Sequence, residues 1–431
     1  MTLYLPSTRF HKATALARSL LTTLMERKGI PGLSVAVGVD GQTVWEEGFG
    51  YADVENSVKM TADTLVRVGS ISKMITTLAV AKLIDEGKLD IDRPIQEYLP
   101  NFPVKKWNDQ ELTFTTRQLM NHTAGFRHYL TKFDIRQRLA NSREGSPQLP
   151  NAIIDAYEYC KQVEGSLPPE FYNRNKYQTI SNSLELFQND PLINEPGSRF
   201  HYSTFGWIIV AGIVENVVGT KFTDHMANLL CQLGFHYSYP DVHNDIRANR
   251  VRYYSRQSNG NLINSPIVDC SWKVASGGYL STVKDLTHLA NVMLRSCYYN
   301  GTGRCDGLFR PEIVHHLWTP YQDAFDEQGT YGLGCRSYKE NIVNANNVRP
   351  NHHVFHTGRG VGFGSVIHIT LDGEDLTCDG NLIATKIPLT GKIVNDTFHG
   401  ATVAMLANIE NYHLQHIAKA LASIFISYLK R

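Results

Sequence analysis

Alternating apolar and polar residues predict β-strands near both ends of the chain. Residues 32–52 contain two strand-like runs, and Asp40-Gly41 between them is a strong signal for a two-residue hairpin turn. Late in the chain, 365–371 (SVIHITL) and 401–409 (ATVAMLANI) have the β-branched and apolar character of buried strands. We therefore expect one antiparallel sheet to which both ends of the chain contribute.

Apolar residues also recur with helical spacing, which predicts helices before, between and after these strands. The helix after Ser70 has almost no polar face, so we expect it to be buried, and Gly87 is expected to end it. The predicted helical segments are 13–29, 70–86, 115–126, 203–219, 282–294 and 412–429. This pattern predicts an α/β (α+β) fold in which helices flank the sheet and a helical subdomain is inserted between its strands.

The chain has no internal repeat or flexible linker, so we expect a single domain over residues 14–431. Residues 131–190 are polar and poor in aliphatic side chains, which favours a variable insertion or a mobile flap. The predicted parts are a short N-terminal tail (1–13), an α/β part (about 14–88 and 270–431) and a mainly helical part (about 89–269) that carries the insertion (about 131–190).

Composition excludes several classes of function. The 42 basic and 41 acidic residues nearly cancel, and no basic stripe is present, which argues against nucleic-acid binding. No apolar run approaches the roughly 20 residues that span a bilayer, so no transmembrane segment is predicted. The seven cysteines are scattered without zinc or redox spacing, and we expect reduced thiols and no metal. The residues before Glu26 resemble a mitochondrial presequence in composition, yet the helical spacing of their apolar residues and the closing Gly29 favour the first helix of the fold.

Ser70 and Lys73 are the first candidates for chemistry. One helical turn separates them, so both side chains can converge, and a neutral lysine could accept the serine proton. Burial beside an apolar helix would lower the pKa of that lysine. The same S-x-x-K pattern occurs at Ser281 and at Ser427, so the pattern alone is weak. The buried helix that follows it distinguishes the first match.

Further motifs carry a family resemblance. RVGSISKMITT, RQLMNHTAGF, EPGSRFHYSTFGW, VASGGYLSTVKDL and HTGRGVGFGS occur in the order typical of the serine β-lactamase and penicillin-binding-protein superfamily. The chain resembles the class C-like branch of that superfamily and, within it, the mitochondrial branch of animals. The likeness extends from about residue 14 to the end. It implies a β-lactamase/transpeptidase-like fold and a serine hydrolase that requires no cofactor.

The resemblance also assigns catalytic roles. Ser70 would be the nucleophile that forms an acyl-enzyme, with Lys73 as its base. Tyr202 in HYSTFGW matches the tyrosine of the family motif Y-x-N, where nearby charges could lower its pKa and let it take the serine proton. Thr204 occupies the asparagine position of that motif, with a shorter side chain for contacting substrate.

The third family motif, usually K-T-G, reads His356-Thr357-Gly358 here. By resemblance, Arg359 would give a backbone N–H to the oxyanion hole together with that of Ser70. The histidine replaces a permanent charge by one that titrates near pH 6.5, which would weaken the anchoring of a substrate carboxylate at neutral pH. We therefore expect activity to depend on pH through His356 and Lys73.

The sequence thus predicts a serine hydrolase, with a peptidase acting on peptide or small ester substrates as the leading hypothesis. An esterase or a D-stereospecific peptidase with the same site is the first alternative. A self-assembling scaffold with weak or lost catalysis is the second. The resemblance further implies mitochondrial residence, assembly into homo-oligomers or filaments, and a link to lipid metabolism.

Overall fold

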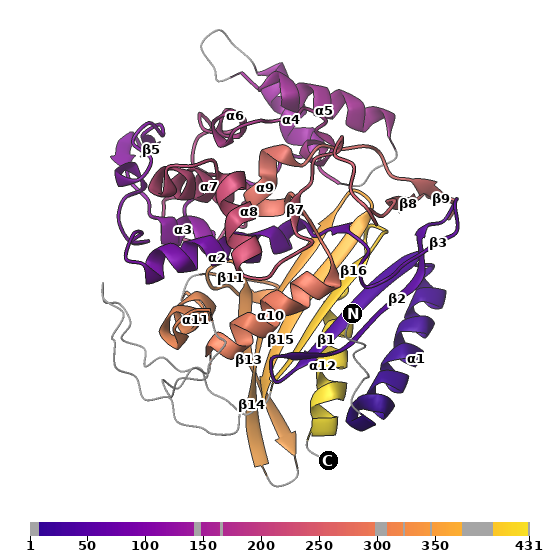
Figure 1. Ribbon diagram of the computed structural model, residues 1–431. Helices are drawn as coiled ribbons and strands as arrows, with labels where there is room; N and C mark the ends of the chain where they lie inside the picture. Colours follow the sequence, from indigo (N-terminus) through magenta and orange to yellow (C-terminus); the bar gives the residue numbers. More distant parts are fainter. Residues whose placement is uncertain are drawn as a thin grey trace.

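A seven-stranded antiparallel sheet forms the centre of the molecule (Figure 1). The computed structural model describes residues 8–141, 148–163, 167–297, 308–321, 324–344, 347–372 and 400–429. The strand order is β13-β14-β15-β16-β1-β2-β3. The strands are β1 (Gly32–Val39), β2 (Gln42–Asp53), β3 (Val58–Lys59), β13 (Arg336–Asn344), β14 (Asn347–Gly360), β15 (Phe363–Asp372) and β16 (Gly400–Ala407).

The pairing of β1 with β16 joins the two ends of the chain, as the sequence predicted. Val37 lies opposite Val403, and every residue of both strands is buried. The β1–β2 hairpin turns at Asp40 and Gly41, which have φ values of 48° and 74°, the left-handed geometry that this turn requires. Strands buried on both faces explain why these segments read as nearly continuous apolar runs.

Helices cover both faces of the sheet (Figure 1). On one face, α1 (His11–Lys28) and α12 (Gln415–Leu429) pack together against β1, β15 and β16. On the other face, α10 (Val283–Cys297) packs against β1 and β16. Phe10 belongs to the same core as α12, so the described part of the expected 1–13 tail is integrated into the fold, and the tail prediction is wrong there.

The helical part continues from the α10 face of the sheet (Figure 1). Its central helix is α2 (Ser72–Asp85), of which all residues but three are buried, as its apolar sequence predicted. A three-stranded sheet, β4 (Val66–Arg67), β10 (Tyr279–Ser281) and β7 (Tyr239–Pro240), lies beside it. The other helices are α3 (Thr116–Met120), α4 (Lys132–Ala140), α5 (Asn151–Gln162), α6 (Ile180–Leu184), α7 (Phe205–Val218), α8 (Phe222–Gln232), α9 (Val274–Gly277) and α11 (Pro311–Trp318).

The 131–190 insertion is more ordered than its polar composition suggested. Its described residues form α4, α5, the 3₁₀ turn η4 (Pro169–Tyr172) and α6. A few apolar side chains per helix, among them Ile135, Ile153 and Tyr157, are buried in the main core. A helix needs only one such stripe to dock, and a stripe of this size barely raises the average hydrophobicity of the segment.

Three short two-stranded hairpins lie outside the two larger sheets in the described part of the chain. The hairpins are β5–β6 (Lys105–Trp107, Gln110–Leu112), β8–β9 (Tyr254–Arg256, Leu262–Asn264) and β11–β12 (Phe325–Asp326, Gly329–Thr330). Cys160, Cys231, Cys270 and Cys335 are free thiols, while Cys305 and Cys378 lie outside the described residues. No helix in the described ranges is by itself long and apolar enough to cross a membrane; α7 and α8 together would be, with a 79° bend between them.

Candidate active site

Ser70 lies in a tight 3₁₀ turn, η2 (Gly69–Ile71), directly before α2. Gly69 precedes it with a φ of 53°, and a Cβ at this position would lie 2.9 Å from the ring of Phe363. Only glycine meets both demands without strain. The turn packs against β14, and Ser365 Oγ donates a 2.8 Å hydrogen bond to the Val68 carbonyl, which fixes the start of the turn to the sheet.

Lys73 lies one turn further along, fully buried beneath Ser70. Its Nζ is 3.3 Å from Ser70 Oγ and donates a 2.8 Å hydrogen bond to the carbonyl of Ser276, which orients it. Burial lowers the pKa of Lys73 well below its usual value, and the charge of Lys273 lowers it further. A neutral amine held at this distance can accept the serine proton.

Tyr202 completes the group around the serine. Its hydroxyl is hydrogen-bonded to the Ser70 side chain, and Lys73 Nζ lies 4.9 Å from the centre of its ring. Burial raises the pKa of Tyr202, and the bond to Ser70 only partly opposes this. The expectation of a lowered pKa is therefore wrong: the phenol keeps its proton and is suited to donate it. Since Lys73 is itself neutralised by burial, it provides little charge to favour a phenolate.

Thr204 follows Tyr202 at the start of α7. Its hydroxyl is hydrogen-bonded to the side chain of Tyr129, and its backbone N–H donates to His128 Nδ1 at 3.3 Å. Thr204 lines the same cavity as Ser70. Because its short side chain is already engaged, it holds the wall in place instead of presenting a free amide to substrate, as an asparagine could.

His356 in the third motif is a neutral side chain. Its Nδ1 donates to the carbonyl of Thr357 at 2.7 Å, and its Nε2 accepts from the Tyr331 hydroxyl at 2.9 Å. Burial, with a further contribution from Lys73, lowers the pKa of His356 to about 3. The expected titration near pH 6.5 is therefore corrected: this histidine stays uncharged at physiological pH and supplies no cation to the site.

The end of β14 approaches the serine turn closely enough to form an oxyanion hole. The backbone nitrogen of Arg359 lies 3.1 Å from the point where a Cβ at Gly69 would be. A Cβ at Gly358 would lie 2.0 Å from the Val68 carbonyl, so a side chain there would push strand and turn apart. The backbone nitrogen of Arg359 therefore lies beside the turn that contains Ser70.

Most of the predicted site residues lie around one cavity of about 760 Å³. Ser70, Tyr202 and Thr204 line it together with the third motif and Arg359, while Lys73 lies beneath its floor. Many further lining residues were not predicted, among them His128, Tyr129, Phe171 and Lys273. These four come from loops and from the insertion, where no local pattern distinguishes a side chain that lines a cavity from one that does not.

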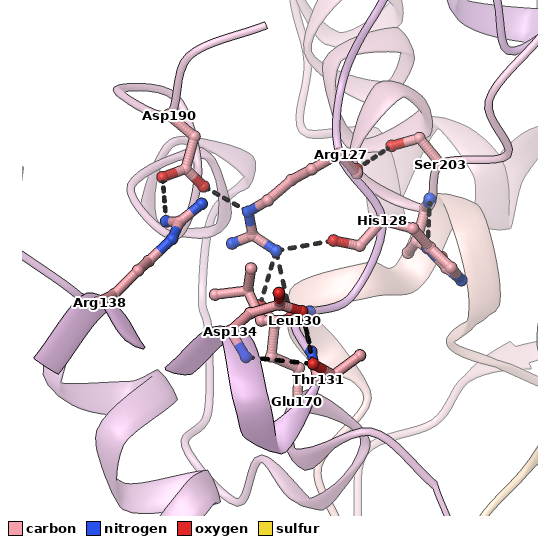
Figure 2. Close-up of polar contacts among 10 residues, drawn as sticks. Arg127, His128, Leu130, Thr131, Asp134, Arg138, Glu170, Asp190 and Ser203 are labelled. Atoms are coloured by element: carbon pink, nitrogen blue, oxygen red, sulfur yellow. Dashed lines mark hydrogen bonds and ion pairs between the residues drawn. The ribbon is translucent and has the colours of Figure 1, made fainter. Parts of the chain in front are cut away.

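A buried ion network fixes the wall that the insertion contributes (Figure 2). Arg127 directly precedes the lining residues His128 and Tyr129 in the chain, and it pairs with Asp190 and, at 3.1 Å, with Glu170 of η4. Asp190 also accepts a 2.8 Å hydrogen bond from Arg138 of α4. The described part of the insertion is therefore bonded to the cavity wall through charges that would be costly to separate.

Among the residues that the structure describes, no group of three or more His, Cys, Asp and Glu side chains is arranged to hold a metal ion.

Comparison with known proteins gives three kinds of match. A family model described as Beta-lactamase matches residues 17–422. The serine beta-lactamase-like protein LACTB, mitochondrial, of Mus musculus is 34% identical over 90% of this chain and 77% of its own length, and that of Homo sapiens is 34% identical over 90% and 76%.

Solved structures share the fold. The octameric penicillin-binding protein homologue from Pyrococcus abyssi has a TM-score of 0.66 at 22% identity, covering 96% of this chain and 77% of its own. A class C beta-lactamase has a TM-score of 0.64 at 18% identity, covering 98% of both chains. A D-stereospecific amidohydrolase from Streptomyces sp. has a TM-score of 0.62 at 19% identity, covering 95% and 98%.

Proposed function

This chain belongs to the β-lactamase family and resembles the LACTB proteins within it, and we propose that it is a serine hydrolase acting through a Ser70 acyl-enzyme. The observation that carries the proposal is the environment of Lys73, a fully buried amine 3.3 Å from Ser70 Oγ. A lysine of ordinary pKa would be protonated and could not act as a base.

In the acylation step, Ser70 Oγ attacks the substrate carbonyl carbon while its proton passes to Lys73 Nζ. The carbonyl oxygen becomes an oxyanion, which the backbone N–H groups of Ser70 and Arg359 stabilise. Tyr202 gives its proton to the leaving group, and Lys73 passes the proton that it took from Ser70 to Tyr202, so that the bond from carbonyl carbon to leaving group breaks and the acyl-enzyme remains.

In the deacylation step, a water molecule attacks the acyl carbon and gives its proton to the neutral Lys73. The second tetrahedral intermediate collapses, the acid product leaves, and Ser70 Oγ regains a proton. Each group returns to its starting protonation state, so no external reductant, oxidant or cofactor is required.

We favour a peptidase among the serine hydrolases, with peptide or small ester substrates. The cavity of about 760 Å³ is large enough for several residues of a peptide. An esterase and a D-stereospecific peptidase would use the same catalytic residues. The fold shared with a D-stereospecific amidohydrolase keeps the D-stereospecific peptidase relevant. Parallel libraries of L-peptides, D-peptides and esters separate the three.

Labelling tests the proposal directly. A fluorophosphonate probe phosphorylates an activated serine, so we expect a single adduct on the tryptic peptide that contains Ser70, located by mass spectrometry. Ser281→Ala is the matched control, since it removes another serine of the same pattern away from the cavity. Absence of an adduct on folded protein, or an adduct that persists in Ser70→Ala, would contradict the proposal.

A scaffold function with weak or lost catalysis is the second candidate, proposed on one observation: a structural neighbour is described as octameric. Homo-oligomers or filaments would appear as large particles in light scattering or electron microscopy. Large particles without a Ser70 adduct would favour the scaffold over the enzyme. Mitochondrial residence and a link to lipid metabolism are likewise proposed from the resemblance to LACTB, whose name includes the organelle.

A further inference from the structure

His122 is a buried histidine with a left-handed backbone. Its φ is 64°, and it directly follows Asn121, the residue that caps the end of α3. Glycine or asparagine is preferred at such a position, because the left-handed conformation is strained for most residues with a Cβ. The other non-glycine residues with positive φ in the described ranges are aspartates, asparagines and a serine, and none of them is buried. A buried histidine here indicates that its side chain is needed.

Two acceptor atoms of His122 hold the peptide groups on either side of Tyr202. The His201 N–H donates a 2.8 Å hydrogen bond to the His122 carbonyl, and the Ser203 N–H donates a 3.1 Å hydrogen bond to its Nδ1. The centre of the imidazole also lies 4.3 Å from the centre of the Tyr202 ring, with 36° between the ring planes. His122 therefore contacts this tyrosine before it, after it and on its ring.

The hydrogen bond to Nδ1 defines the state of the imidazole. Because Nδ1 accepts from an N–H, the ring is neutral and carries its proton on Nε2. Burial lowers the pKa of His122 well below its usual value, in agreement with a neutral ring. Nε2 has no hydrogen-bond partner among the described residues, and the rings of Phe200, Trp207 and Tyr331 lie close by. An unpaired buried N–H is unfavourable, so a side chain kept only for packing would be better without it.

The loop that contains His122 also binds the residues after Tyr202. Ser203 Oγ donates a 2.6 Å hydrogen bond to the carbonyl of Arg127 (Figure 2), and the Thr204 N–H donates to His128 Nδ1 at 3.3 Å. Arg127 is itself fixed by the buried ion network. The segment that carries the phenol is therefore held by four hydrogen bonds to one anchored loop.

We propose that His122 is a positioning residue that keeps the Tyr202 hydroxyl on Ser70. The inference rests on the proposed hydrolase function, in which Tyr202 gives its proton to the leaving group. His122 does not line the cavity, so it acts on the reaction through the tyrosine. A catalytic group displaced by about 1 Å can lower a rate roughly 10²-fold, so the loss of this support should be measurable.

Two esters with the same acyl group separate positioning from a general loss of structure. Methoxide needs a proton from a general acid in order to leave, whereas p-nitrophenolate leaves without one, so the methyl ester depends more strongly on Tyr202. We expect His122→Gly to lower kcat/KM about tenfold or more for the methyl ester and less than about threefold for the p-nitrophenyl ester. A fluorophosphonate, whose fluoride also leaves unprotonated, should label Ser70 at a nearly unchanged rate.

His122→Asn is the matched variant. Asparagine tolerates a left-handed backbone, as glycine does, and its amide oxygen can replace Nδ1 as the acceptor for the Ser203 N–H. Both variants lose the imidazole ring, so the difference between them isolates the acceptor. His122→Asn should therefore recover most of the methyl-ester kcat/KM that the glycine variant loses. His288→Asn, which removes a histidine bonded to the Leu233 carbonyl outside the cavity, should leave kcat/KM for both esters unchanged.

Combination with Tyr202→Phe tests whether His122 acts through the phenol. Tyr202→Phe should itself impair the methyl ester more than the p-nitrophenyl ester, and adding His122→Gly should cause little further loss, because the group to be positioned is gone. His122→Ala serves if thermal melts show that the glycine variant does not fold. Equal losses for the two esters, losses that add to those of Tyr202→Phe, or an asparagine variant no better than the glycine variant would overturn the inference. Failure of the hydrolase proposal is seen separately, as absence of fluorophosphonate labelling at Ser70 in the unaltered protein.

Discussion

The same four-residue pattern produces two different environments in this molecule. Ser70 lines the cavity and Lys73 is buried beneath it, with Nζ 3.3 Å from Oγ. Ser281 and Lys284 have the same spacing, yet Ser281 Oγ is hydrogen-bonded to Ser238 at 2.9 Å, and Lys284 Nζ forms ion pairs elsewhere. Only the first pair is arranged for nucleophilic chemistry.

Backbone geometry explains the difference. Ser70 lies in a 3₁₀ turn that runs straight into α2, so a helical turn brings Lys73 back toward it. Ser281 ends strand β10, and α10 begins only at Val283, so the serine and Lys284 do not share a helical face. A spacing of three residues predicts convergence only when both residues lie in one helical turn.

Electrostatics separates the two lysines further. Burial lowers the pKa of Lys73 well below its usual value. For Lys284, partial burial acts in the same direction, but the hydrogen bond to Asp63 and the charge of Glu46 outweigh it, so its pKa is raised. A base and a permanently charged surface group thus arise from the same pattern, and the surroundings decide which one forms.

The largest expected effect comes from replacing each of the two serines by alanine in turn. Ser70→Ala should lower kcat by roughly 10⁴-fold or more, because the covalent route disappears. Ser281→Ala should leave kcat within a few-fold and cost on the order of 1 kcal/mol of unfolding free energy for one lost buried hydrogen bond. Steady-state kinetics with an ester reporter and urea unfolding measure both. Comparable kcat losses in the two variants would contradict the contrast between the sites.

Replacement of the two lysines should give the next largest effect. Lys73→Met should lower kcat/KM by roughly 10²- to 10⁴-fold, the usual contribution of a general base, while the buried methionine remains compatible with folding. Lys284→Met should change kcat/KM little and stability by less than about 1 kcal/mol, since its ion pairs are partly exposed and screened by solvent. Thermal melts distinguish loss of catalysis from loss of fold. A Lys73→Met enzyme with normal turnover would remove Lys73 from the mechanism.

The fold was predictable because its strands and helices carry strong local patterns. Asp40-Gly41 dictates its turn whatever surrounds it, and the apolar segments at 365–371 and 401–409 became β15 and β16. The insertion at 131–190 was harder to interpret, because an ion network around Arg127 secures it, and charged side chains look the same in sequence whether paired or solvated.

The candidate site was predictable only where residues belong to ordered motifs. Ser70, Tyr202 and His356 were identified and the structure brings them together around one cavity. Their protonation states were not predictable, because the pKa of Tyr202 and of His356 depends on how deeply each ring is packed. Lys273, which also lines the cavity, belongs to none of the motifs and carried no sequence signal.

The pH profile gives the smallest effect and the sharpest test of the contrast between the two lysines. Only neutral Lys73 can accept the serine proton, so kcat/KM should fall about tenfold per pH unit below the pKa of Lys73, as one acid limb. His356, with a pKa of about 3, adds no second break between pH 5 and 8. The limb should keep its position in His356→Asn and in Lys284→Met, whatever their rates. It should move to higher pH in Lys273→Met, because the charge of Lys273 lowers the pKa of Lys73. An acid limb that shifts in His356→Asn or in Lys284→Met instead would show that Lys73 is not the titrating base. The proposed difference between the two serine–lysine pairs would then be wrong.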